Sequence, residues 1–287
     1  MGAVYRKELR QYFGGMLGWV IAAILLLFGG LFTAAFHLLS RNTDFSPVLI
    51  AMQWVLIVTV PFLTMRSIAQ ERHTRTEQLL YSLPLSQAEI VLGKYFAMLT
   101  VFLLPTAVMA LYPLILDGMG AFSLASAYTA LFGYLLMGGA LIAVCTYLSA
   151  LSENQITAAI AGMGTLLLIY LLNTLTGLLP SGAIGSFIGC VVLLLAAGAL
   201  MWRAANNLNL GLIASAVSIL LLTVLYLVRS SLFEGLLPRL VRAVDLFSRF
   251  RGFAYGRIDL VGTVFYLSVS LFFLFLTVQT MEKRRLV

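Results

Sequence analysis

The side chains with the most varied chemistry in this 287-residue chain gather in one polar stretch, residues 69–92. Within it Glu71 precedes Arg75 by four positions, the spacing and order at which an ion pair stabilises a helix. Charged, hydroxyl and amide groups beside an apolar edge suit contacts with another protein surface, and a solvated loop is the simpler alternative. The contact residues selected on this basis are Glu71, Arg72, His73, Thr74, Arg75, Thr76, Glu77, Gln78, Leu79, Leu80 and Pro84.

The same stretch contains a helix stop followed by a helix start. Pro84 ends the first helix, because proline lacks a backbone N–H and clashes with the preceding turn. Ser86 and Glu89 have the Ser-x-x-Glu form of a capping box, which begins a second helix. This second helix is expected to lead directly into a long apolar run.

The chain lacks the residue patterns for nucleotide hydrolysis, metal binding and covalent catalysis. A phosphate-binding loop needs a glycine-rich turn followed by Gly-Lys-Ser/Thr. The only lysines are Lys7, Lys94 and Lys283, and Gly93-Lys94 is followed by Tyr95. We therefore expect a protein that is not an enzyme and that holds no metal or cofactor itself.

The composition is that of a membrane protein. Hydrophobic residues make up 61% of the chain and charged residues 10%, against about 25% charge in a soluble domain. The net charge of +7 comes from short basic segments between apolar runs, which usually set topology and meet lipid headgroups. No continuous basic face is present, so nucleic acid is not an expected partner.

The apolar runs predict an all-α, polytopic transmembrane helix bundle, because many of them reach the roughly 20 residues that cross a bilayer. We predict eight spans, with six as the alternative if the pair within 184–228 is re-entrant or interfacial. No internal repeat is visible, so the whole chain, 1–287, is expected to form a single domain. The eight predicted spans are 17–39, 48–68, 93–116, 123–151, 156–179, 184–202, 210–228 and 260–280.

The first residues, 3–16, predict a short helix in the headgroup layer of the membrane lipids rather than a span. Apolar and aromatic side chains fall on one helical face and basic side chains on the other. The alternative is a frayed start of the first span. The side chains assigned to this interfacial helix are Tyr5, Arg6, Lys7, Glu8 and Arg10.

An even number of spans places both termini on the same side of the membrane. Cytoplasmic termini put most of the lysines and arginines inside, in agreement with the positive-inside rule. The exception is the mixed segment 229–259, which is then extracytoplasmic although it carries six arginines. An amphipathic helix containing Arg239 and Arg242 at the outer surface would accommodate this charge.

The predicted spans contain few groups that could bind an ion. Ion-coupled carriers need a charged group at membrane depth, and the polar residues in the middle of these spans are uncharged. The residues selected as candidates to line a pathway are Gln53, Thr59, Asn173 and Thr174. The energy for transport is therefore expected to arrive through protein contacts, and a nucleotide-independent carrier or channel is the less favoured reading. A membrane scaffold that recruits partners through residues 69–92 is a further alternative.

The polar stretch and the start of the third span resemble the signature of ABC-2-type transporter permeases. The N-terminal run Tyr5–Leu9 resembles the interfacial helix that opens these permeases, and the C-terminal span resembles that of the gliding-motility-associated branch. The copper-enzyme-maturation branch is a close neighbour. The residues that carry the signature are Glu71, Thr76, Leu79, Leu80, Pro84, Ser86, Ile90, Val91, Leu92, Gly93, Lys94 and Tyr95.

The resemblance implies a function and a set of partners. It implies a permease subunit in the bacterial cytoplasmic membrane, working with two copies of a cytoplasmic ABC ATPase that bind ATP and Mg. It implies pairing of the permease with itself or with a second permease subunit. Glu71–Leu83 would be the coupling helix that docks into the ATPase. Arg75 departs from the glycine that is usual in the family, and Gln78 from an acidic residue.

Overall fold

The computed structural model describes residues 1–39, 44–74, 85–118, 123–175, 182–205, 216–220, 222–223, 225–226, 229 and 233–285. Throughout these ranges the regular secondary structure is helical and contains no strand, which confirms the all-α prediction there. The helices are α1 (Gly2–Gly14), α2 (Met16–Thr33), the π-helix η1 (Ala34–Leu39), α3 (Ser46–Thr64), α4 (Ala69–His73), α6 (Gln87–Met109), α7 (Tyr112–Asp117), α8 (Leu124–Leu151), α9 (Gln155–Leu175), α10 (Ala183–Ala205), α12 (Leu236–Val244), α13 (Phe250–Ala254) and α14 (Leu260–Arg285).

Six of the described helical segments are long and apolar enough to cross a membrane. They match six of the eight predicted spans. The predicted span 184–202 falls on α10, in which Ala183–Val192 is a shorter apolar segment. The predicted span 210–228 lies mostly outside the described residues. The six segments are Met16–His37, Ser46–His73, Gln87–Asp117, Leu124–Leu151, Gln155–Leu172 and Leu260–Arg284.

The contacts divide the chain into two compact units. Unit 1 comprises Met1–Leu168 and Arg249–Val287, and unit 2 comprises Ile169–Ser248. The single-domain organisation stays a prediction. Unit 2 contains α12, whose helical conformation at Arg239 and Arg242 agrees with the amphipathic helix expected there. Within unit 2, Leu237 of α12 packs against Gly189 of α10.

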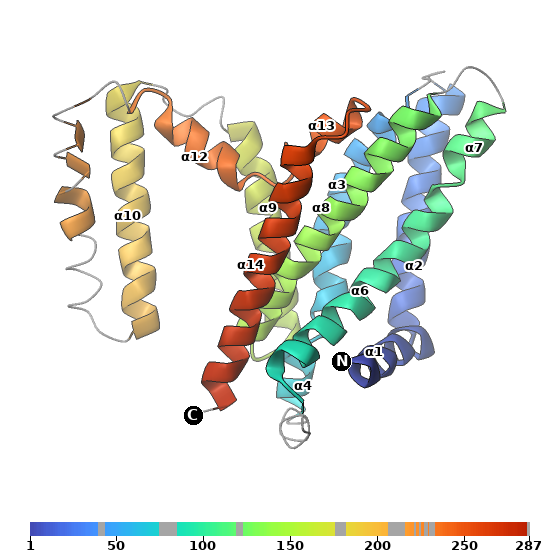
Figure 1. Ribbon diagram of the computed structural model, residues 1–287, viewed down its shortest axis with the longest axis horizontal. Helices are drawn as coiled ribbons and strands as arrows, with labels where there is room; N and C mark the ends of the chain where they lie inside the picture. The colour runs from blue at the N-terminus through green and yellow to red at the C-terminus, as the bar shows by residue number, and fades with distance from the viewer. Residues whose placement is uncertain are drawn as a thin grey trace. The chain divides into compact units, whose positions relative to one another are not determined.

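The core of unit 1 is built around α8, which packs against α3, α6, α13 and α14 (Figure 1). Small residues on α8 allow this close approach. A Cβ atom at Gly138 would lie 2.3 Å from the ring of Phe102 on α6, and one at Gly133 would lie 2.4 Å from Phe253 on α13. Glycine is therefore required at both helix crossings, because interiors are packed too tightly to hold an extra methyl group.

One end of unit 1, here called the α1 end, gathers segments that are far apart in the sequence. Figure 1 shows α1, α4 and both chain termini at this end, and α7 and α13 at the opposite end. Arg284 near the C-terminus donates a hydrogen bond to the Leu151 carbonyl at the end of α8, at 3.4 Å. The described parts of the polar stretch, 69–74 and 85–92, lie at the α1 end.

Candidate functional site

A buried lysine lies at the centre of the α1 end. The capping box predicted at the start of α6 is present: the Glu89 N–H donates to the Ser86 hydroxyl at 3.2 Å, and the Ser86 N–H donates to Glu89 Oε2 at 3.1 Å. The helix therefore begins at Gln87, six residues before the predicted span. This early start places Lys94 inside the helix and on its buried face, with Ile90 and Val91.

All three N–H groups of the Lys94 ammonium can be satisfied by acceptors from other segments. Lys94 Nζ lies 2.8 Å from Glu8 Oε1, 2.9 Å from Glu71 Oε1 and 2.7 Å from the Ser67 carbonyl. Lys7 Nζ lies 3.3 Å from the same oxygen of Glu71. We call Lys7, Glu8, Glu71 and Lys94 the charged junction. Its two cations and two anions sum to zero charge.

The members of the charged junction differ in their contact with solvent. The side chain of Lys94 is 1% exposed, that of Glu8 5% and that of Glu71 13%, whereas Lys7 is 57% exposed. Buried charges are tolerated only when they are paired and hydrogen-bonded. The junction therefore joins α1, α4 and α6 by contacts that none of the three helices makes by itself.

Helix α1 is held against the bundle by further contacts. Its buried residues are Val4, Glu8 and Tyr12, spaced one helical turn apart. The Tyr12 hydroxyl donates to the Leu63 carbonyl at 3.0 Å. That carbonyl lies in the last turn of α3, where helix carbonyls lack partners within the helix. Burial, and next the negative charge of Glu8, raises the pKa of Tyr12, so its hydroxyl remains a proton donor.

The start of the polar stretch is anchored to the break between α8 and α9. The Ala69 N–H donates to the Ser149 hydroxyl at 3.2 Å, and Arg72 Nη1 donates to the Ser152 carbonyl at 2.8 Å. Together with Glu71, these contacts fix α4 on two sides. His73 and Thr74 are exposed. The remaining contact residues proposed from the sequence lie outside the described residues: Arg75, Thr76, Glu77, Gln78, Leu79, Leu80 and Pro84.

The described side chains revise two expectations from the sequence. Glu8 was expected on an interfacial helix beside Arg6 and Arg10, and it is buried because it neutralises Lys94. Glu71 was expected to reach a partner surface, and its carboxylate turns inward to Lys94 and Lys7. Its role in docking stays a prediction. A lone lysine next to a 20-residue apolar run was the signal that a buried carboxylate must lie nearby.

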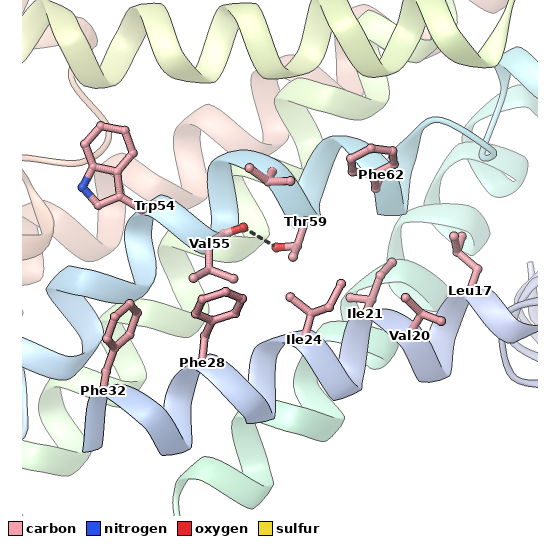
Figure 2. Close-up of a pocket in the computed structure, with 11 residues that line it drawn as sticks. Leu17, Val20, Ile21, Ile24, Phe28, Phe32, Trp54, Val55, Thr59 and Phe62 are labelled. Atoms are coloured by element: carbon pink, nitrogen blue, oxygen red, sulfur yellow. Dashed lines mark hydrogen bonds between the residues drawn. The ribbon is translucent and has the colours of Figure 1, made fainter. Parts of the chain in front are cut away.

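The predicted pathway residues make contacts within the bundle. Thr59 donates to the Val55 carbonyl of its own helix at 2.8 Å. Gln53 is buried, with its Nε2 3.9 Å from the Met137 sulfur. The side chains of Asn173 and Thr174 lie outside the described part of α9. A pathway lined by these residues stays a prediction. Thr59 also borders an apolar groove of about 620 Å³ between α2 and α3 (Figure 2).

The hydrogen bond of Tyr12 gives a first testable prediction. Tyr12→Phe should lower the free energy of unfolding by about 1 to 2 kcal/mol, because the buried Leu63 carbonyl loses its donor. Tyr5→Phe is the control, since the Tyr5 hydroxyl pairs with Thr100 Oγ1 at 3.0 Å in a part-buried position and should matter less. Denaturant titration of the purified protein in mixed micelles measures both. Equal effects of the two substitutions would contradict a stabilising role for the hydrogen bond from Tyr12 to the Leu63 carbonyl.

The six long apolar helical segments among the described residues define a multi-pass membrane protein. Residues 33–228 match the family model described as ABC-2 family transporter protein. The match covers more than half of the chain, and the chain belongs to this family. Comparison with curated proteins gives no match, and comparison with solved structures gives none. The matched range includes Glu71 and Lys94 but begins after Lys7 and Glu8.

Proposed function

We propose that this chain is the permease subunit of an ABC transporter and that a separate cytoplasmic ATPase drives it through residues 69–92. The charged junction is the observation that supports this proposal most strongly. It connects the start of that stretch to α1 and to the third span. A force applied to the stretch would therefore reach two helices through contacts shorter than 3 Å.

Membership of the ABC-2 family supports a cytoplasmic ATPase as partner, and its copy number and the permease pairing are part of the proposal. Two ATPase subunits would bind ATP and Mg, and this chain would pair with itself or with a second permease subunit. The gliding-motility-associated branch is the assignment we retain within the family. Substrate export or mechanical work would be the output.

The proposed topology places the α1 end in the cytoplasm. Among the described residues at this end, cations outnumber acidic groups. The positive-inside rule assigns such an end to the cytoplasmic side. We retain eight spans, because α10 at 23 residues is long enough to cross a bilayer of about 30 Å. Both termini are then cytoplasmic, and 229–259 is extracytoplasmic. The described cations at the α1 end are Arg6, Lys7, Arg10, Arg66, Arg72, Lys94, Lys283 and Arg284.

The proposed mechanism is a two-state movement of the membrane helices. ATP-driven closure of the ATPase pair would displace the coupling helix Glu71–Leu83. The charged junction would make α1, α4 and α6 follow as one body. Binding energy of ATP then biases one of two helix arrangements, which is how a ligand shifts a conformational equilibrium.

The experiment is ATPase stimulation by the permease in the complex purified from its native membrane. Gln78→Pro should abolish stimulation, since proline breaks the coupling helix at about 3 kcal/mol while the described contacts stay intact. Glu71→Arg should also abolish it, with an added folding defect, because it sets a third cation against Lys7 and Lys94. Glu153→Arg, an exposed glutamate at the same end, is the control.

Three outcomes decide between this proposal and its alternatives. Loss of stimulation in Gln78→Pro but not in Glu153→Arg supports coupling through this stretch. Full stimulation in both Gln78→Pro and Glu71→Arg would show that the ATPase acts elsewhere. Substrate movement without any nucleotide would favour the carrier or channel reading instead.

A further inference from the structure

The groove between α2 and α3 is apolar along its length. Side chains of the two helices face each other across it, with Phe28 and Phe32 of α2 toward the end far from Leu17 (Figure 2). Six of the lining residues expose more than a third of their surface, so the groove is open on the side away from the bundle core. The lining residues are Leu17, Val20, Ile21, Ile24, Phe28, Phe32, Trp54, Val55, Val58, Thr59 and Phe62.

The groove offers almost no hydrogen bonds to an occupant. The Thr59 hydroxyl is committed to the Val55 carbonyl at 2.8 Å. The other polar side chain, Trp54, lies with Phe32 at the end far from Leu17 (Figure 2). A polar ligand would lose its hydration here without replacement, which disfavours peptides and sugars. A hydrocarbon chain makes no hydrogen bonds with water and so has none to lose on entering the groove.

The length of the groove suits a lipid tail. Leu17 and Phe32 are 15 residues apart on α2, which corresponds to about 22 Å at 1.5 Å per residue. One leaflet of a bilayer core is about 15 Å thick, half of roughly 30 Å. The groove between these two membrane-spanning helices is therefore long enough to hold an acyl chain over the whole depth of one leaflet.

An exposed arginine follows the groove-lining residues of α3. Trp54, Val58 and Phe62 are each four residues apart and lie on one face of α3. Arg66 is the next position in this series, just beyond the helix end at Thr64, and it is exposed. This end of α3 lies against α1, because the Tyr12 hydroxyl donates to the Leu63 carbonyl in the last turn of α3. An arginine in this position matches the phosphate of a lipid headgroup.

We propose that the α2–α3 groove is a binding site for a phospholipid with an anionic headgroup, taken from the leaflet on the α1 side. The tail lies between Leu17 and Phe32, and the phosphate pairs with Arg66. The site does not depend on the ATPase, so it stands or falls separately from the function proposed above.

The test is photo-crosslinking in vesicles of phosphatidylethanolamine and phosphatidylglycerol, with a diazirine on the acyl chain of phosphatidylglycerol. Labelling should concentrate on peptides of α2 and α3. Val58→Trp fills the groove and should reduce this labelling about tenfold, equivalent to roughly 1.4 kcal/mol. Leu271→Trp is the matched control, because Leu271 is 67% exposed on α14 and lies outside the groove. It should leave the labelling unchanged.

The headgroup is tested by a second pair of variants. Arg66→Gln should remove the preference for the phosphatidylglycerol probe over a phosphatidylethanolamine probe with the same tail. Lys283→Gln, an exposed cation at the same end, should keep that preference. Circular dichroism and size-exclusion profiles matching those of the unsubstituted protein verify that each variant is folded.

Three results would overturn the proposal. Equal labelling of the groove and of the α14 surface would show ordinary boundary lipid. A disulfide between two chains carrying Val58→Cys would show that a second copy of this protein covers the groove. Retained preference in Arg66→Gln would remove the anionic headgroup from the assignment.

Discussion

Lys94→Met is expected to lower the free energy of unfolding by about 3 to 5 kcal/mol, the cost of removing one partner from a buried ion pair. Methionine retains much of the length of the lysine side chain, so the main loss is the charge. Glu8 and Glu71 then face one another across the space that held a single nitrogen, at side-chain exposures of 5% and 13%. Denaturant titration in mixed micelles measures the change. Protease sensitivity at the Gly14–Gly15 break should rise, because α1 loses its anchor.

The control for this prediction is Lys283→Met, which removes an exposed lysine at the same end of the bundle. Its effect should be close to zero, since exposed charges contribute little to stability. The double variant Lys94→Met/Glu8→Gln should recover part of the loss, because it removes one of the two uncompensated carboxylates. A double-mutant cycle isolates that coupling. Equal effects of Lys94→Met and Lys283→Met would show that the charged junction does not hold the α1 end together.

Gly138→Ala is expected to destabilise the protein by about 1 to 3 kcal/mol through overpacking. The new methyl carbon would stand 2.3 Å from Cε1 and 2.5 Å from Cζ of Phe102. The Phe102 ring is 1% exposed and has the Tyr134 ring 5.6 Å away, so it has little room to move. Separation of α6 from α8 is then the remaining way to relieve the contact. The same titration in micelles measures the effect.

Gly164→Ala provides the matched control on another membrane helix. A Cβ atom at Gly164 meets nothing within 4 Å. Alanine should there stabilise the helix by up to about 1 kcal/mol, because it is the better helix former. Phe102→Leu combined with Gly138→Ala should cost less than the sum of the two single changes. If Gly138→Ala and Gly164→Ala had the same sign, the close approach of α6 and α8 would be refuted.

The two predictions concern different ways in which unit 1 is held together. Around Gly138, α8 and α6 are held by close packing, and the stabilisation comes from many weak van der Waals contacts. At the charged junction a few ionic contacts hold α1 and α4, two short helices that bury few apolar side chains of their own. In the proposed transporter these few contacts also determine which segments would move together.

Local patterns were enough to predict much of the fold. Apolar runs mark the six spans because the bilayer requires about 20 apolar residues in each, wherever they stand in the sequence. The capping box at Ser86 was readable because its partner, Glu89, is three residues away. The helix start predicted at this cap is confirmed, and only the membrane span within the helix was placed from residue 93 onward. The family also followed from local spacing between Glu71 and Tyr95.

The charged junction was not predicted, and the reason is physical. Glu8 and Glu71 stand 86 and 23 residues from Lys94, and sequence separation carries no information about which of several carboxylates will pair with a buried ammonium. Periodicity places Glu8 one turn from both Val4 and Tyr12, on the apolar face of α1, but it does not say which cation that face would meet. The requirement for a partner was visible in the sequence, but its identity was not.

The sequence alone determined that this chain is a helical membrane protein, where most of its spans run and to which family it belongs, because hydropathy, helix caps and motif spacing act over a few turns of one segment. Only the tertiary structure decided that α1 packs on α6, that Lys94 is neutralised by Glu8 and Glu71, and that α2 and α3 leave a groove between them. These features depend on how separate helices approach one another, and that approach is set by the packing of many side chains at once.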